Sequence, residues 1–285
     1  MPANPTTTIS TSFVKYYEAE VNEAYQRQGS KLRNTVRFKN NIRGVSAIFP
    51  KIGKGSADTK TRNGDVPVMR LAHDVVEIPL TDYYCGEWID ALDELKTNID
   101  ERMVAAQNGA YALGRKTDEL IIGALDGMTN TASVISGSGD LADTVGLTKA
   151  KILAAFQLLG RNEVPDDGER YCVIGWKQWS DLMAVPEFAN AQYVAPDQLP
   201  WQNSQAKHWL GTLFIPHSGL NIVNGARQCY WYHRRSLGVA AGQDIKTDIS
   251  WHGDKAAWFV SNMISIGAGL LDTAGLVRMR CADTN

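Results

Sequence analysis

The chain has 285 residues, of which 44% are hydrophobic and 21% are charged, and its formal net charge is −2 at pH 7. This composition, with eight Trp, argues against a disordered chain and indicates one large or two modest globular domains. The sequence starts without the basic and apolar regions of a secretory signal, and no apolar run is long enough to span a bilayer.

Charge is divided between two adjacent segments. Residues 24–73 carry 11 Lys and Arg against two acids, and residues 74–126 carry 12 acids against four Lys and Arg. Opposite potentials on different parts of identical molecules favour head-to-tail association of copies. The alternative is that both segments are solvated faces without a partner. We favour association, because the basic segment has the composition of an extended arm and the acidic segment overlaps the strongest helix signal.

The first two predicted elements precede the acidic segment. A short helix is predicted where Phe13, Tyr17 and Val21 recur every four residues, and Gly29 can end it. Two extended runs follow at 45–52 and 66–80, joined by a polar stretch that contains an Asn-Gly turn signal. A long hairpin with a polar tip cannot bury itself against its own core, so we expect it to contact a neighbour or to stay mobile.

A long helix is predicted over residues 98–125. Apolar side chains advance mostly in steps of three or four, and Gly127 follows as a stop signal. The helix would be roughly 40 Å long at 1.5 Å per residue. Its three glycines, Gly109, Gly114 and Gly123, each cost about 1 kcal/mol relative to Ala. Such a helix is usually pressed closely onto another element.

The remaining sequence predicts a mixture of helices and strands. Two helices are expected at 148–159 and 177–185. Strands are expected at 170–175, 213–215, 229–232, 244–251, 256–266 and 275–280. We read Gly267-Ala268-Gly269 as close packing of a strand, not as a phosphate cradle. The fold class is therefore α+β, with no βαβ repeat.

No motif in the sequence indicates catalysis. The five His residues lack metal-ligand spacing, and no nucleophile elbow, phosphate-binding loop or dinucleotide fingerprint is present. We therefore expect no catalytic residue, metal or cofactor, and a soluble α+β enzyme is the remotest alternative.

The order of elements and several segments resemble one family. The segments are residues 88–95 (WIDALDEL), 112–121 (ALGRKTDELI), 209–218 (WLGTLFIPHS), 231–240 (WYHRRSLGVA) and 267–277 (GAGLLDTAGLV). Together they are similar to the major capsid proteins of tailed bacteriophages, which have the Hong Kong 97-type capsid fold. The resemblance covers nearly the whole chain, although no single segment is as specific as a metal-ligand pattern.

The resemblance implies a division of the chain into five parts. These are an N-terminal arm with a short helix (1–44), an extended β-hairpin loop (45–82), a peripheral domain with the spine helix (83–140), an axial α+β domain (141–243) and returning strands that complete both domains (244–285).

The resemblance also implies a function. The chain would assemble into hexamers and pentamers of an icosahedral head that encloses double-stranded DNA without sequence-specific binding. Its other partners would be a portal, a separate scaffolding protein and, where present, decoration proteins, and it would be located in the virion after assembly in the host bacterial cytoplasm. The runner-up is an encapsulin-like nanocompartment shell around an enzyme cargo.

Two sets of residues are candidates for contacts between subunits. The basic set lies on the hairpin and consists of Lys51, Lys54, Lys60, Arg62 and Arg70. The acidic set precedes the long helix and consists of Glu87, Asp90, Asp93 and Glu94. Two alternatives stay open: a covalent link from Lys51, Lys54 or Lys60 to Asn262 of a neighbour, as some relatives form, and DNA binding by the basic residues between Arg27 and Arg43. We disfavour DNA binding, because a packaging motor needs a shell that does not grip the DNA.

Overall fold

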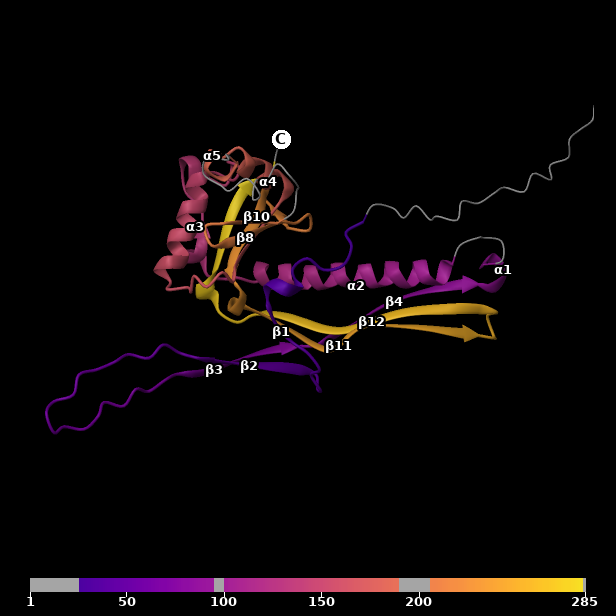
Figure 1. Cartoon of the computed structure of the whole chain (residues 1–285), viewed down its shortest axis with the longest axis horizontal. Helices are drawn as coiled ribbons and strands as arrows, with labels where there is room; N and C mark the ends of the chain where they lie inside the picture. Colours follow the sequence, from indigo (N-terminus) through magenta and orange to yellow (C-terminus); the bar gives the residue numbers. More distant parts are fainter. Residues whose placement is uncertain (1–25, 95–99, 190–205, 284–285) are drawn as a thin grey trace, which may run out of the picture.

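The structure of the protein is a computed structural model that describes residues 26–94, 100–189 and 206–283. It contains three sheets and one long helix, arranged as an elongated arm, a compact body and a projecting hairpin (Figure 1). Nearly all of the helix predicted before Gly29 lies outside the described residues, and 26–29 are not helical. None of the helices within the described ranges is long and apolar enough to cross a membrane.

The arm consists of a four-stranded sheet with the helix α2 along one face (Figure 1). The strand order is β1-β11-β12-β4, and β1 is parallel to β11 while the other pairs are antiparallel. The elements are β1 (Arg37–Lys39), β4 (Thr81–Asp90), β11 (Leu237–His252), β12 (Ala257–Leu270), the short helix α1 (Ala91–Glu94) and α2 (Glu101–Asp126). Asp100 caps α2, because its side chain accepts a hydrogen bond from the backbone N–H of Met103 at 3.3 Å.

Close packing explains two of the three glycines in α2. A Cβ atom at Gly109 would lie 2.1 Å from Nδ2 of Asn262 on β12, and one at Gly114 would lie 2.7 Å from backbone atoms of Gly29. At Gly123 no atom lies within 4 Å. The prediction that glycines let this helix approach its neighbours is therefore confirmed at the first two positions and wrong at the third.

The body is a seven-stranded sheet covered by three helices. The strand order is β5-β13-β10-β6-β8-β7, and β9 pairs with β10. The strands are β5 (Val134–Ile135), β6 (Arg170–Ile174), β7 (Lys207–Trp209), β8 (Thr212–Pro216), β9 (Ile222–Val223), β10 (Ala226–His233) and β13 (Leu276–Ala282). The helices are α3 (Lys149–Arg161), α4 (Trp176–Met183) and α5 (Pro186–Ala189). One apolar core, which includes Leu125, Trp179 and Trp231, runs from α2 into this sheet.

The hairpin consists of β2 (Ser46–Ile52) and β3 (His73–Pro79), and it projects from the joint between arm and body (Figure 1). Its root has a small core of its own around Phe49 and Ile78. Ile78 packs onto β12 where Gly267 and Gly269 leave room, since a Cβ at Gly269 would lie 2.9 Å from Ile78. The close-packing interpretation of these glycines is confirmed, but the expectation that the hairpin has no core in its own chain is wrong at the root.

Three element predictions need correction. Residues 66–72 are not part of a strand, which starts at His73. Strand β4, whose residues 88–90 pair in register with residues 257–259 of β12, was not predicted. The buried first half of β11, before Gln243, was not predicted. The division into five parts stays a prediction, and β11 crosses its boundary at residue 243, where the pairing with β12 is irregular.

We expect Gly114→Ala and Gly123→Ala to have opposite effects on the free energy of unfolding. A methyl group at Gly114 would overlap the backbone of Gly29, and the resulting shift should cost about 1–3 kcal/mol. At Gly123 there is open space, so alanine should add up to about 1 kcal/mol of helix propensity. Urea denaturation of the unassembled subunit measures both, and a change of the same sign would contradict the close-packing explanation.

Candidate interaction surfaces

Two of the five basic candidates have acidic partners in their own chain. Nζ of Lys51 lies 3.1 Å from Oδ1 of Asp272. Lys54 forms a hydrogen-bonded ion pair with Glu163, and this hydrogen bond lowers the pKa of the Glu163 carboxyl. The pair of Lys54 is largely exposed and that of Lys51 is partly exposed, and ion pairs in contact with solvent contribute only about 0–1 kcal/mol. A neighbouring subunit is therefore not needed to balance the charges of Lys51 and Lys54.

The other three basic candidates lie on the part of the hairpin that has no strand. Lys60, Arg62 and Arg70 are exposed, and none of them has an ion pair within the described ranges. The same segment exposes apolar side chains that we did not single out from the sequence: Val66 is 71%, Val68 83% and Met69 53% exposed. The signal that could have revealed them is the run Val-Pro-Val-Met directly after the turn.

The structure brings three of the acidic candidates together. Glu87, Asp90 and Asp93 line a groove of about 450 Å³ between β4 and the first turns of α2. Glu101 completes this acidic rim, although we did not select it from the sequence. The side chain of Glu94 lies outside the described residues. The groove is at one end of the molecule and the tip of the hairpin is at the other (Figure 1), so the two sets do not meet within one chain.

Asn262 does not fit the proposed covalent link. Its side chain is 1% exposed, it accepts a hydrogen bond from Thr247 at 2.5 Å, and it packs beneath α2 against Gly109. A lysine of a neighbouring hairpin would have to displace the helix to reach it. The accessible surface therefore excludes Asn262 as the acceptor in the folded subunit.

A buried carboxylate joins the N-terminal arm, α2 and the body. Asp118 of α2 is fully buried and accepts hydrogen bonds from Oγ of Ser30 at 2.5 Å and from the backbone N–H groups of Lys31 and Leu32 at 3.1 Å. Nε2 of His217, which follows β8, lies 3.1 Å away. Nδ1 of His217 accepts from the N–H of Gly219 at 3.0 Å, and Nη1 of Arg27 lies 2.7 Å from Nε2, so the imidazole is held between Gly219, Arg27 and Asp118.

The environment of Asp118 keeps it ionised. Burial acts to raise its pKa. The hydrogen bonds from His217 and from the N-terminal segment outweigh burial, so the pKa of Asp118 lies below its ordinary value. Arg27 adds a positive charge, with Nε 3.6 Å from Oδ2. No pattern in the sequence separates Asp118 from the other acids of its segment.

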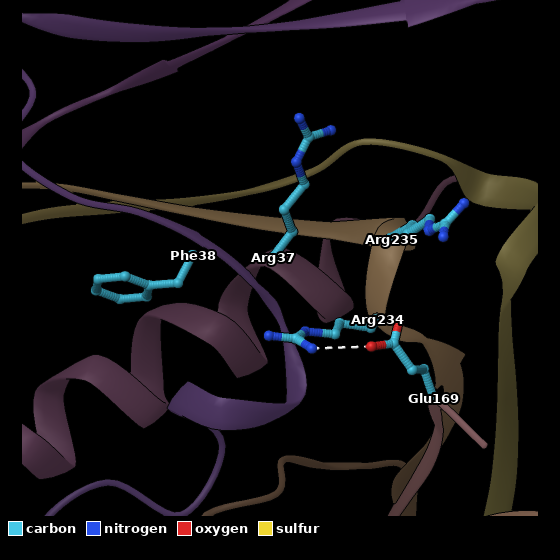
Figure 2. A pocket seen from close by; sticks show the side chains of 5 residues that line it. All are labelled: Arg37, Phe38, Glu169, Arg234 and Arg235. Carbon is cyan, nitrogen blue, oxygen red and sulfur yellow. Dashed lines mark hydrogen bonds and ion pairs between the residues drawn. The ribbon is translucent and has the colours of Figure 1, made fainter. Parts of the chain in front are cut away.

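A second pocket lies at the joint between arm, hairpin and body. It has a volume of about 440 Å³ and is lined by Arg37, Phe38, Glu169, Arg234 and Arg235. Arg234 pairs with Glu169 at 2.9 Å, and Figure 2 shows the guanidinium groups of Arg37 and Arg235 pointing in different directions. Because the three guanidinium groups do not converge, the pocket does not form a cradle for one small anion.

Asp167, Glu169 and His233 lie close enough to consider a metal site. Nδ1 of His233 accepts from the backbone N–H of Arg235 at 3.2 Å, so Nε2 carries the hydrogen and donates to Asp167 at 3.0 Å. Glu169 is already paired with Arg234. His233 therefore has no free lone pair for a metal, and the trio is explained as a hydrogen-bond network.

Comparison with known proteins gives one consistent result. A family model described as phage capsid protein matches residues 9–283. The fold is similar to the capsid protein of cyanophage P-SCSP1u, with a TM-score of 0.74, 15% identity, and coverage of 96% of this chain and 94% of that one. The cyanophage Pam1 capsid gives a TM-score of 0.73 and 15% identity, and the match covers 99% of this chain and 100% of that one. The Ralstonia phage GP4 capsid gives a TM-score of 0.70 and 13% identity, and the match covers 100% of both chains. No curated protein is similar enough to match.

We expect Asp118→Asn to destabilise the subunit strongly. The amide group would turn an N–H donor toward the donors of the arm and His217, and breaking a buried charged network typically costs about 3–5 kcal/mol. Glu119→Gln is the matched control, because the side chain of Glu119 is 68% exposed and pairs with Lys116 on the helix surface. Denaturant unfolding of the unassembled subunits measures the free energy of unfolding of both variants. Similar decreases in the two would show that the buried network does not contribute more to stability than a surface ion pair.

The stabilisation by Asp118 should depend on pH. Its pKa in the folded state lies below the unfolded value, which is about 3.9. The contribution is therefore fully present above about pH 4 and is lost as the pH falls through the folded-state pKa. We expect the free energy of unfolding to fall between about pH 5 and about pH 2 in both proteins. The fall should be larger in the unchanged chain than in the Asp118→Asn variant. Parallel pH profiles would refute this assignment.

Proposed function

This chain belongs to the phage capsid protein family and is a major capsid protein of a tailed bacteriophage, and we propose that its copies form the hexamers and pentamers of an icosahedral head around double-stranded DNA. The family resemblance predicted from the sequence is thereby confirmed. Capsid proteins of this fold assemble with copies of themselves and are located in the virion.

Contact between the hairpin of one subunit and the acidic end of its neighbour is the central part of the proposal. The observation that carries it is the separation of the two charged sets. Lys60, Arg62 and Arg70 are exposed on the hairpin, at one end of the folded molecule. The groove with Glu87 and Asp90 lies between β4 and α2, at the opposite end (Figure 1). Charges that cannot pair within a subunit can pair between subunits placed head to tail.

Weak contacts suit this role. An exposed ion pair contributes only about 0.2–1 kcal/mol, so a misplaced subunit can dissociate before the shell closes. The same contact repeated around a closed shell adds up to a stable particle. The proposed role of the chain is therefore structural, not catalytic.

Two of the six basic residues from Arg27 to Arg43 pair with acids inside the subunit. Arg27 faces Asp118, and Arg33 forms a bidentate pair with Asp244 at 2.8 and 2.5 Å. This use supports the proposal that the shell encloses DNA without gripping it through the cluster from Arg27 to Arg43. The other four are exposed: Lys31, Arg37, Lys39 and Arg43. The guanidinium of Arg37 lies 5.5 Å from the ring of Phe49.

The remaining partners follow from membership of the family. We propose that a portal and a separate scaffolding protein take part in assembly, that decoration proteins are optional, and that assembly occurs in the host bacterial cytoplasm. Electron microscopy of purified particles tests the whole proposal. A portal vertex, a tail and packed DNA are expected, whereas an enzyme cargo in a tailless shell would contradict it.

We expect the triple change Lys60→Glu, Arg62→Glu and Arg70→Glu to block assembly without unfolding the subunit. Like charges would then face the acidic groove of the neighbour, and the subunit concentration needed for assembly should rise more than about tenfold. Sedimentation and negative-stain microscopy measure assembly, and circular dichroism measures folding.

Two further variants complete this test. Lys60→Arg, Arg62→Lys and Arg70→Lys keep the charge and should assemble normally. Adding Glu87→Lys, Asp90→Lys and Glu101→Lys to the charge-reversed hairpin should partly restore assembly, and high salt should slow early association, because exposed charges are screened within about 8–10 Å. Normal assembly of the charge-reversed hairpin alone would refute the contact.

A further inference from the structure

Three Asn-Gly steps occur in the sequence, at Asn63-Gly64, Asn108-Gly109 and Asn224-Gly225. An asparagine followed by glycine is chemically the least durable asparagine, because glycine has no side chain to hinder attack by its own backbone nitrogen on the neighbouring carboxamide. The structure places the three steps in three different environments. The environments determine which asparagine can react in the folded subunit.

The reaction makes a definite demand on the backbone. The glycine nitrogen bonds to Cγ of the asparagine, the bond from Cγ to Nδ2 breaks, and ammonia leaves with the amide proton of the glycine. Water then opens the resulting succinimide ring at either carbonyl, which gives aspartate or isoaspartate. The nitrogen can reach Cγ only where the asparagine backbone can rotate and where the glycine N–H is not kept in a helix or sheet.

The step at Asn108-Gly109 lies inside α2. Regular helix fixes the backbone of both residues, and the N–H of an interior residue such as Gly109 donates to the carbonyl four residues earlier. Gly109 is buried and Asn108 is half-buried. Oδ1 of Asn108 also accepts a hydrogen bond from Nε2 of Gln26. Reaction at this site therefore requires local opening of α2.

The step at Asn224-Gly225 forms the tight turn between β9 and β10. The two residues have φ of 53° and 76°, which is the combination found in type I′ turns. Val223 and Ala226 pair directly across the turn, and the carbonyl oxygen of Gly225 accepts from the N–H of Asp283 at 3.2 Å. Asn224 is exposed, but its backbone is held on both sides and cannot rotate freely.

The step at Asn63-Gly64 lies in the part of the hairpin that projects beyond β2 and β3 (Figure 1). Asn63 is exposed, and a single turn holds its backbone, in which the N–H of Gly64 donates to the carbonyl oxygen of Thr61 at 3.0 Å. Loss of one solvent-exposed hydrogen bond costs only about 0.5–1.5 kcal/mol. Reactive backbone conformations are therefore far more accessible here than in α2 or in the turn between β9 and β10.

We propose that Asn63 is a site of spontaneous deamidation and that it reacts faster than Asn108 and Asn224. Residues 54–70 carry four basic and two acidic residues, so the net charge of this segment falls from +2 to +1 when Asn63 becomes an acid. Isoaspartate also lengthens the backbone of the hairpin by one CH₂ group. In a step that rests on the proposed function, the modified hairpin attracts the acidic groove of a neighbour less strongly, so unassembled subunits lose competence for assembly with age.

Peptide mass spectrometry of aged subunits tests the site. The full-length, unassembled subunit is incubated at neutral and at mildly alkaline pH, and isoaspartate is detected by enzymatic methylation. We expect Asn63 to react at least about tenfold faster than Asn108 and Asn224, because those two need local opening. The rate should rise with pH, since the attacking nitrogen must lose its proton, and both aspartate and isoaspartate should form.

Gly64→Ala is the matched control for the chemistry. The added methyl group hinders the attacking nitrogen but keeps the amide of Asn63, and it meets first the hydroxyl of Thr61, which can rotate away. The variant should slow the reaction at position 63 and leave Asn108 and Asn224 unchanged. An equal or faster reaction at Asn108 or Asn224 would overturn the inference, and so would aspartate without isoaspartate at position 63.

Assembly of Asn63→Asp subunits tests the consequence separately. We expect the subunit concentration needed for assembly to rise by up to about fivefold, because one exposed charge changes a contact by at most about 1 kcal/mol. Unchanged assembly of Asn63→Asp, with assembly blocked by charge reversal at residues 60, 62 and 70, would overturn the effect of ageing and leave the proposed contact intact. Normal assembly of both variants would overturn the contact and this consequence, whereas the reaction at Asn63 would stand on the mass spectrometry.

Discussion

The buried carboxylate of Asp118 is the interaction on which the arrangement of this subunit depends. It lies in α2 and contacts both the N-terminal segment, through Ser30, and the body, through His217. An ionised group without water must have all its acceptor positions filled, so the three segments are fixed relative to one another. One turn away, Gly114 lets the N-terminal segment cross α2 with Gly29 in contact with the helix. A side chain at position 114 would push this segment away from the helix.

The two ends of the arm follow from this arrangement. With α2 fixed on one face of the sheet, glycines at 267 and 269 admit the hairpin root on the other face. The same sheet continues past the hairpin to Trp88, which packs against Phe259 and is 42% exposed. The subunit is thus well packed around its joint and exposes apolar side chains at its extremities.

The sequence predicts the elements of this fold well where apolar periodicity or glycine positions indicate them. It predicts them poorly where a strand forms only because a distant strand pairs with it. The helix predicted over 98–125 is α2, and the close packing of Gly267 was expected from an apolar run. Strand β4 was hidden because Trp88 to Asp90 resemble a helix entry until β12 pairs with them. The charged sets were predictable from composition, but the role of Asp118 was not, since its partners lie 88 and 99 residues away in sequence.

The long helix also has a mechanical consequence. From Asp118 to Glu101 it extends about 26 Å at 1.5 Å per residue, and it is backed along that length by β12. If helix and sheet move together as one stiff lever, its pivot is the buried carboxylate that joins the three segments. A rotation of about 5° at the pivot displaces the far end by about 2 Å over that length. Rings of five and of six copies require neighbours to meet at different angles, and a lever of this kind converts a small adjustment at one side chain into a change of curvature.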